Sequence, residues 1–78
     1  GRSAVAEPRV ATVSPVRVRI VHTAVPGTYY ETLSGRVGLC IQADERVLRF
    51  ATALGEPDFE LTPARGLALY ELRLVPAR

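Results

Sequence analysis

Turn-forming residues recur about every 8–12 positions along most of this chain. From residue 16 onward, the segments between them are rich in β-branched and other apolar residues. Short runs of this kind, bounded by Gly and Pro, are typical of strands in a small barrel or sandwich. The sequence therefore predicts an all-β fold.

Charged and β-branched residues alternate in the clearest strand, over residues 16–21. We expect Val16, Val18 and Ile20 to face the core, and Arg17 and Arg19 to face solvent. Four more strands are predicted, over residues 36–43, 46–53, 58–62 and 72–75.

Within the strand over residues 36–43, alternation places Val37, Leu39 and Ile41 on one face. Asp44–Glu45 is interpreted as a two-residue turn into the next strand. These elements predict a small five-stranded barrel over residues 16–78, preceded by an extended N-terminal arm over residues 1–15.

An α+β fold is the alternative interpretation. Thr62–Pro63 has the form of a helix N-cap followed by a first-turn proline, and a helical turn is expected within residues 67–71. A helical spacing also relates Val47, Phe50, Ala51 and Leu54. The regular turn spacing favours the barrel.

With 78 residues and 47 % hydrophobic content, the chain is one small domain rather than a disordered tail. A domain of this size favours a binding module or a small subunit over an enzyme with a deep pocket. Cys40 is the only cysteine, which excludes an intramolecular disulfide, and it is expected in the core. His22 is the only histidine, so this chain cannot form a catalytic triad or a histidine metal pair alone. We predict no catalytic residue, metal or cofactor.

All ten basic residues are arginine, and the net charge is +2. Residues 1–30 carry four Arg and one Glu (+3), whereas residues 31–78 carry six Arg and seven acidic residues (−1). A mildly basic first strand favours an acidic partner. Such a charge is weak for tracking a nucleic-acid backbone. The alternating residues Glu56, Asp58 and Glu60 are interpreted as a solvated acidic rim, with a weak cation site as the less favoured alternative.

Four motifs occur in a recognisable order. They are Val18-Arg19-Ile20; Thr28-Tyr29-Tyr30, four residues and then Gly35-Arg36-Val37; Val47-Leu48-Arg49-Phe50; and Ala68 followed by Glu71-Leu72-Arg73-Leu74-Val75. This order resembles the E subunit of photosystem I (reaction-centre subunit IV), a small SH3-like barrel on the stromal face. Tyr30 stands where that family has Trp, and residues 62–66 replace an Asn-rich stretch.

The resemblance implies a non-catalytic peripheral subunit on the stromal side of the chloroplast thylakoid membrane. Such a subunit stabilises the complex and assists docking of the acidic carrier ferredoxin. The arginine before phenylalanine contributes to that docking in the family, and Arg49 is the matching residue. Contacts with other subunits or ferredoxin are expected from Arg17, Arg19, Arg49, Tyr29 and Tyr30. Membrane contact is expected only through partners.

Two alternatives remain. The S subunit of the photosynthetic NAD(P)H dehydrogenase-like complex is similar, although its Tyr-to-Gly spacing is one residue shorter. A free-standing bacterial SH3-like adaptor or nucleic-acid-binding module, cytoplasmic in that case, would use the surface formed by Arg17, Arg19, Tyr29 and Tyr30.

Overall fold

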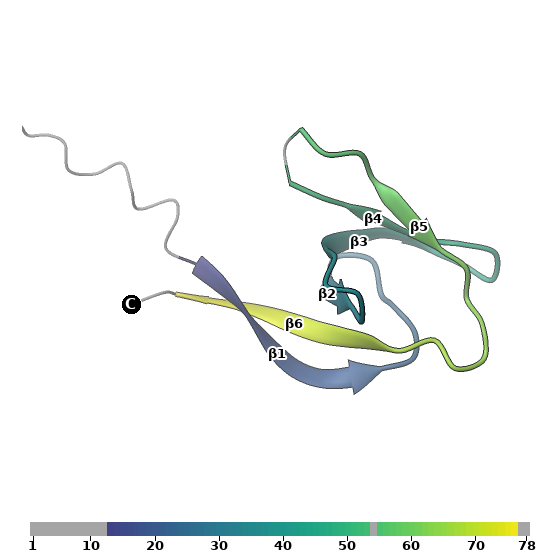
Figure 1. The fold of residues 1–78 in the computed structure, drawn as a ribbon, viewed down its shortest axis with the longest axis horizontal. Coiled ribbons are helices and arrows are strands. Elements are labelled where there is room, and N and C mark those ends of the chain that lie inside the picture. Colours follow the sequence, from purple (N-terminus) through teal and green to yellow (C-terminus); the bar gives the residue numbers. More distant parts are fainter. Residues whose placement is uncertain (1–12, 54, 77–78) are drawn as a thin grey trace, which may run out of the picture.

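The computed structural model describes residues 13–53 and 55–76, which form one six-stranded antiparallel sheet and no helix (Figure 1). The strands are β1 (Val13–Val21), β2 (Tyr29–Thr32), β3 (Val37–Ala43), β4 (Leu48–Ala51), β5 (Phe59–Leu61) and β6 (Leu69–Pro76). Their order across the sheet is β1-β6-β2-β3-β4-β5. The predicted all-β class is confirmed, and the α+β alternative is wrong for this part of the chain.

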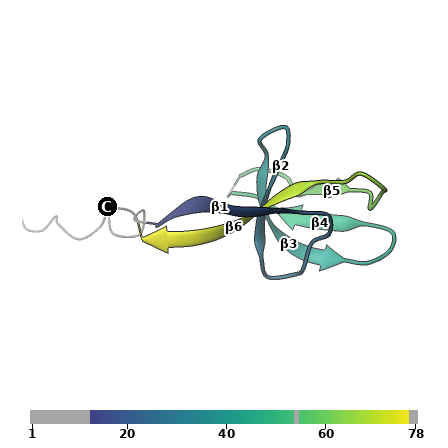
Figure 2. The ribbon, with the colours of Figure 1, turned by 90° about the horizontal axis from the view of Figure 1, so that it is seen from below.

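The sheet curls into a half-barrel, and its concave side encloses the core (Figure 1). Strands β2 to β5 follow one another as a meander, whereas β6 returns to lie between β1 and β2. Strand β6 is longer than β2, so its end pairs with β1 alone among the described strands. Figure 2 shows these paired ends of β1 and β6 projecting away from the other four strands.

Aromatic side chains form the centre of the core. Phe50 is fully buried and stacks on Phe59, with ring centroids 5.0 Å apart, while Tyr30 meets it edge-on at 6.1 Å. The guanidinium of Arg36 lies 4.0 Å above the Phe59 ring and covers it from outside. Cys40 is buried in the same cluster, as expected, and burial raises the pKa of its thiol.

The chain has six strands rather than five because Tyr29–Thr32 also forms a strand. This segment is only four residues long, but both of its edges pair, with β3 and with β6. The same pairing explains why Leu69–Glu71 is extended instead of forming the expected helical turn. There the backbone N–H and C=O groups of β6 pair with β1 on one side and with β2 on the other. A single helical turn would leave most of these groups without a partner.

The prediction that the apolar residues of the first strand face the core is wrong, whereas Arg17 and Arg19 are exposed as predicted. Val16, Val18 and Ile20 are all exposed. Ile20 lies on the side of the sheet opposite the core, and Val16 pairs with Arg73, beyond the part of β6 that also pairs with β2. Arg17 pairs with Leu72 and Arg19 with Glu71, so Val18 is the extra residue of a β-bulge. The bulge reverses the alternation and directs Val21 toward the core.

The connection between β3 and β4 is a loop over residues 44–47, longer than the two-residue turn expected at Asp44–Glu45. The Asp44 carboxylate accepts N–H groups of Arg46 (2.8 Å) and Val47 (2.9 Å). These bonds, with one from the Gln42 side chain, lower the pKa of Asp44.

The face predicted for β3 is correct only in part. Val37 and Leu39 both face away from the core, but Ile41 is the extra residue of a second bulge. The residues of β3 that are buried are Gly38 and Cys40. The N-terminal arm was predicted to end at residue 15, yet Val13–Pro15 already belongs to β1, and residues 1–12 lie outside the described residues.

Candidate docking surface

The strand register divides the candidate residues between two faces of the sheet. Residues directly opposite each other on neighbouring strands have side chains on the same face. We call the face that carries Tyr30 and the core the inner face, and the opposite face the outer face. Two cross-strand rows lie side by side on the outer face: Arg17–Leu72–Tyr29–Leu39 and Ile20–Tyr70–Glu31–Val37.

Arg17 reaches across β6 to Glu31 on β2. Its Nε and Nη2 donate to the two carboxylate oxygens of Glu31 at 2.9 and 3.2 Å. Its guanidinium also lies 4.1 Å above the centre of the Tyr70 ring. The Arg17 hydrogen bond lowers the pKa of Glu31 and raises that of Arg17, because it favours the charged form of both groups. This arginine is therefore held flat on the outer face.

The two tyrosines of the motif have opposite environments. Tyr29 is half-buried in the outer-face row that contains Arg17. Tyr30 is 3 % exposed, and its hydroxyl accepts the backbone N–H of Val25 at 2.9 Å. Tyr30 therefore anchors the loop over residues 22–28 to the core, and its ring is not available to stack on a partner.

Arg19 lies in the inner-face row with Glu71 and Tyr30, on the β1 side of the barrel. Its Nε lies 3.1 Å from a carboxylate oxygen of Glu71, and the arginine side chain is largely exposed. Arg19 and Arg17 are thus on opposite faces, although the simple alternation of the sequence places them together. The bulge at Val18 is the cause.

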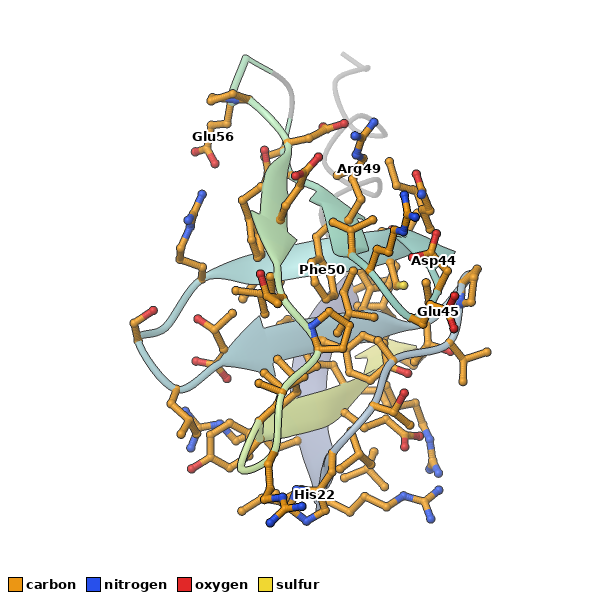
Figure 3. The ribbon with its side chains drawn as sticks, turned by 90° about the vertical axis from the view of Figure 1, so that its right-hand side faces the viewer. His22, Asp44, Glu45, Arg49, Phe50 and Glu56 are labelled. Carbon is orange, nitrogen blue, oxygen red and sulfur yellow. The ribbon has the colours of Figure 1, made fainter. Side chains whose placement is uncertain are left out.

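Arg49 lies on β4, between Gln42 of β3 and Glu60 of β5. Its Nε and Nη2 both donate to one oxygen of Glu60, at 2.9 and 2.6 Å. Figure 3 shows Arg49 directed away from the core that contains Phe50. Strands β6, β2 and β3 separate β4 from β1, so Arg49 and Arg17 belong to different parts of the sheet.

Some residues of the outer face were not predicted to take part. Tyr70 and Glu31 hold Arg17 in place, and Ile20 and Val37 form the two ends of their row. The sequence of β6 does indicate one apolar face, since Tyr70, Leu72 and Leu74 alternate with Glu71 and Arg73. Its outer positions are therefore apolar even though the core lies on the other side.

The histidine and the acidic residues in the described part of the chain do not form a second candidate site. His22 is exposed and donates from Nδ1 to the carbonyl of Leu67 at 2.8 Å, which ties the loop after β1 to the segment before β6 (Figure 3). Of the predicted acidic rim, Glu60 is the member that lies within β5, and it is bonded to Arg49. Residues 13–53 and 55–76 contain no cluster of three or more metal-ligating side chains and no pocket.

No helix in the described part of the chain is long and apolar enough to cross a membrane. The surface of the described residues has three main features. These are an apolar outer face over β1, β6, β2 and β3, the bidentate Arg17–Glu31 pair within it, and a separate exposed Arg49–Glu60 pair. No protein-family model, curated protein or solved structure matches the chain.

Proposed function

We propose that this chain is a non-catalytic, SH3-like subunit of a photosystem I-type complex, where it stabilises the stromal side and assists docking of ferredoxin. The observation that carries the proposal is the exposed guanidinium of Arg49. Within Val47-Leu48-Arg49-Phe50, this residue matches the arginine that assists docking in the family that the chain resembles. The following residue, Phe50, is the centre of the core. The motif thus combines a buried anchor with an outward charge.

The tyrosine motif supports the same assignment. The spacing from Thr28 to Val37 corresponds to the β2–β3 hairpin, and Gly35 takes a φ of 95° in its turn. Tyr30, which stands where the family has Trp, packs edge-on against Phe50. The sequence pattern is therefore the pattern of a hairpin that contributes one aromatic ring to a small barrel core.

Arg49 retains donors for an acidic partner. A guanidinium has five N–H donors, and Glu60 accepts from two of the nitrogens through a single oxygen. Since the pair is exposed, a carboxylate of an approaching carrier can bond to the remaining donors or displace Glu60. A rim charge of this kind acts mainly on the rate of encounter, and salt weakens it.

A titration of the full chain with an acidic [2Fe–2S] ferredoxin tests this proposal. We expect Arg49→Gln to weaken binding at low ionic strength by about 1.4-fold to fivefold, in line with the roughly 0.2–1 kcal/mol of an exposed charge pair. Glu60→Gln is expected to strengthen binding, because it removes the carboxylate that competes for Arg49. Both differences are expected to shrink at high ionic strength.

Arg46→Gln is the matched control, since it removes an exposed arginine from the neighbouring loop. Equal weakening by Arg46→Gln and Arg49→Gln would show a general charge effect and contradict a specific role for Arg49. An affinity that is the same for all variants and at both ionic strengths would exclude the docking function.

The nucleic-acid-binding alternative has less support. It requires Arg17, Arg19, Tyr29 and Tyr30 on one exposed surface, but Tyr30 is buried and the two arginines lie on opposite faces. Each of these arginines is also bonded to a glutamate. No described observation favours this function over protein binding.

A further inference from the structure

The outer face of the sheet carries more apolar side chains than is usual for the face opposite a core. An antiparallel sheet with its core on one side normally alternates apolar-in and polar-out residues. Here the outer positions of β6 are Tyr70, Leu72 and Leu74, and Leu72 is buried although it is not part of the core cluster. On either side of β6, Ile20 of β1 is 53 % exposed and Val37 of β3 is 43 % exposed. We call this surface the outer patch; its residues are Ile20, Tyr29, Val37, Leu39, Tyr70 and Leu72.

The outer patch contains one bidentate ion pair, Arg17–Glu31, which crosses it beside Tyr70. The patch thus carries one positive and one negative charge within an apolar surround. Tyrosine and arginine are among the residue types that are enriched in the binding centres of protein interfaces. Because its two charges already neutralise each other, the patch offers no net field to a strongly charged partner.

We propose that the outer patch binds a second copy of this chain about a two-fold axis, with the two sheets packed face to face. A two-fold interface must be complementary to itself, so each copy has to supply both members of every contact. The outer patch meets this condition, since Arg17 and Glu31 of one copy can exchange partners with Glu31 and Arg17 of the other. The second copy also supplies the second layer that a sheet with two apolar faces needs.

The edge of β1 argues for packing through the face rather than through added strands. Pro15 has no N–H to donate to a further strand, and the bulge at Val18 interrupts the regular ladder. Natural sheets use these two devices to prevent pairing between edges. The exposed apolar side chains of the outer patch are therefore expected to be covered by another sheet face.

This inference is independent of the proposed docking of an electron carrier. Arg49 and Glu60 lie on β4 and β5, outside the outer patch. A dimer through the patch leaves this pair at the rim, and self-association is measured on the isolated chain without any carrier. Failure of one proposal therefore does not imply failure of the other.

Sedimentation equilibrium of the full chain over a wide range of concentrations tests the dimer. We expect a reversible monomer–dimer equilibrium, and we expect Ile20→Glu and Val37→Glu each to raise its dissociation constant at least about tenfold, because each places an unpaired charge in the apolar interface. The matched controls are Val25→Glu and Leu33→Glu. They add the same charge at residues that are 57 % and 65 % exposed in loops off the patch, and they are expected to leave the constant unchanged.

Charge-reversal variants provide a second measurement, in which mixing two variants is expected to restore binding. Arg17→Glu leaves a copy with two acidic groups in the patch, and Glu31→Arg leaves a copy with two basic groups. We expect each variant alone to be monomeric and an equimolar mixture to form heterodimers. A monomeric wild-type chain at every concentration, no association in the mixture, or equal weakening by patch and loop variants would each overturn the proposal.

Discussion

At Gly38 the inner face of β3 approaches two aromatic side chains directly. A Cβ atom at this position would lie 2.7 Å from the Cβ of Phe50 and 3.1 Å from the Phe59 ring. Neither neighbour is able to move away, because Phe50 is fully buried and Phe59 lies between Phe50 and the guanidinium of Arg36. Glycine is required here for space, whereas the other described glycines have positive φ and meet no atom within 4 Å.

We therefore expect Gly38→Ala to lower the free energy of unfolding by about 1–3 kcal/mol, the usual cost of overfilling a packed core. Urea denaturation followed by circular dichroism measures this change. Gly66→Asn is the contrasting variant, since asparagine tolerates positive φ and nothing lies within 4 Å of its Cβ position. If both variants lose the same stability, the proposed clash at Gly38 is wrong.

Cys40 provides a probe of the same core. Burial raises the pKa of its thiol, so the reactive thiolate is scarce at neutral pH and the sulfur is also shielded from reagents. We expect alkylation of the folded chain to be slow and to become fast in denaturant, as followed by mass spectrometry. Rapid modification of the folded chain would contradict the described packing around β3.

At the scale of single elements, the loop between β3 and β4 is held by one carboxylate. Asp44 accepts two backbone N–H groups and a side-chain amide, and these bonds lower the pKa of its carboxyl below that of an unfolded aspartate. A lowered pKa stabilises the fold above the unfolded value and loses this effect as pH falls through the folded value. The loop is thus expected to weaken in acid.

We predict that the wild-type chain loses more stability on acidification below about pH 4 than Asp44→Asn does. The asparagine oxygen still accepts the N–H groups but does not titrate in this range. Asp44→Ala, which removes the acceptor, is expected to be less stable than Asp44→Asn at neutral pH. Urea midpoints across the pH range distinguish the three chains, and parallel pH profiles for the wild type and Asp44→Asn would refute the role of this carboxylate.

At the scale of the whole molecule, the half-barrel has a well-paired centre and two less protected edges. Strands β6, β2, β3 and β4 each have neighbours on both sides, whereas β1 and β5 are the edges of the described sheet. Local opening of an edge strand needs less free energy, because it breaks the hydrogen bonds and contacts with only one neighbouring strand. The edges and the projecting end of the β1–β6 pair are therefore expected to open first.

Amide hydrogen exchange measured by NMR checks this expectation. We expect the slowest exchange in β2, β3 and the first half of β6, and the fastest among the strands in β5 and in the β1 residues that pair with residues 73–76. Uniform protection over all six described strands would instead indicate that the sheet opens only as a unit.

The sequence by itself was enough for the fold class, the position of Cys40 in the core and most of the strand locations. These properties depend on local patterns: β-branched runs, turn residues and the spacing of apolar side chains. Local patterns were not enough for β2, which is only four residues long and depends on partners on both sides. They also failed for Leu69–Glu71, where pairing with β1 and β2 favours an extended backbone over the helical turn expected within residues 67–71.

Only the tertiary structure decided which side chains share a face. The alternation of β1 places Arg17 and Arg19 together, but the bulge at Val18 separates them, and a bulge depends on register with a strand some fifty residues away. The same register brings Arg17 over Tyr70 and onto Glu31, contacts that no sequence spacing indicates. Composition and local pattern determine that a chain forms strands, whereas long-range pairing determines what each strand presents to a partner.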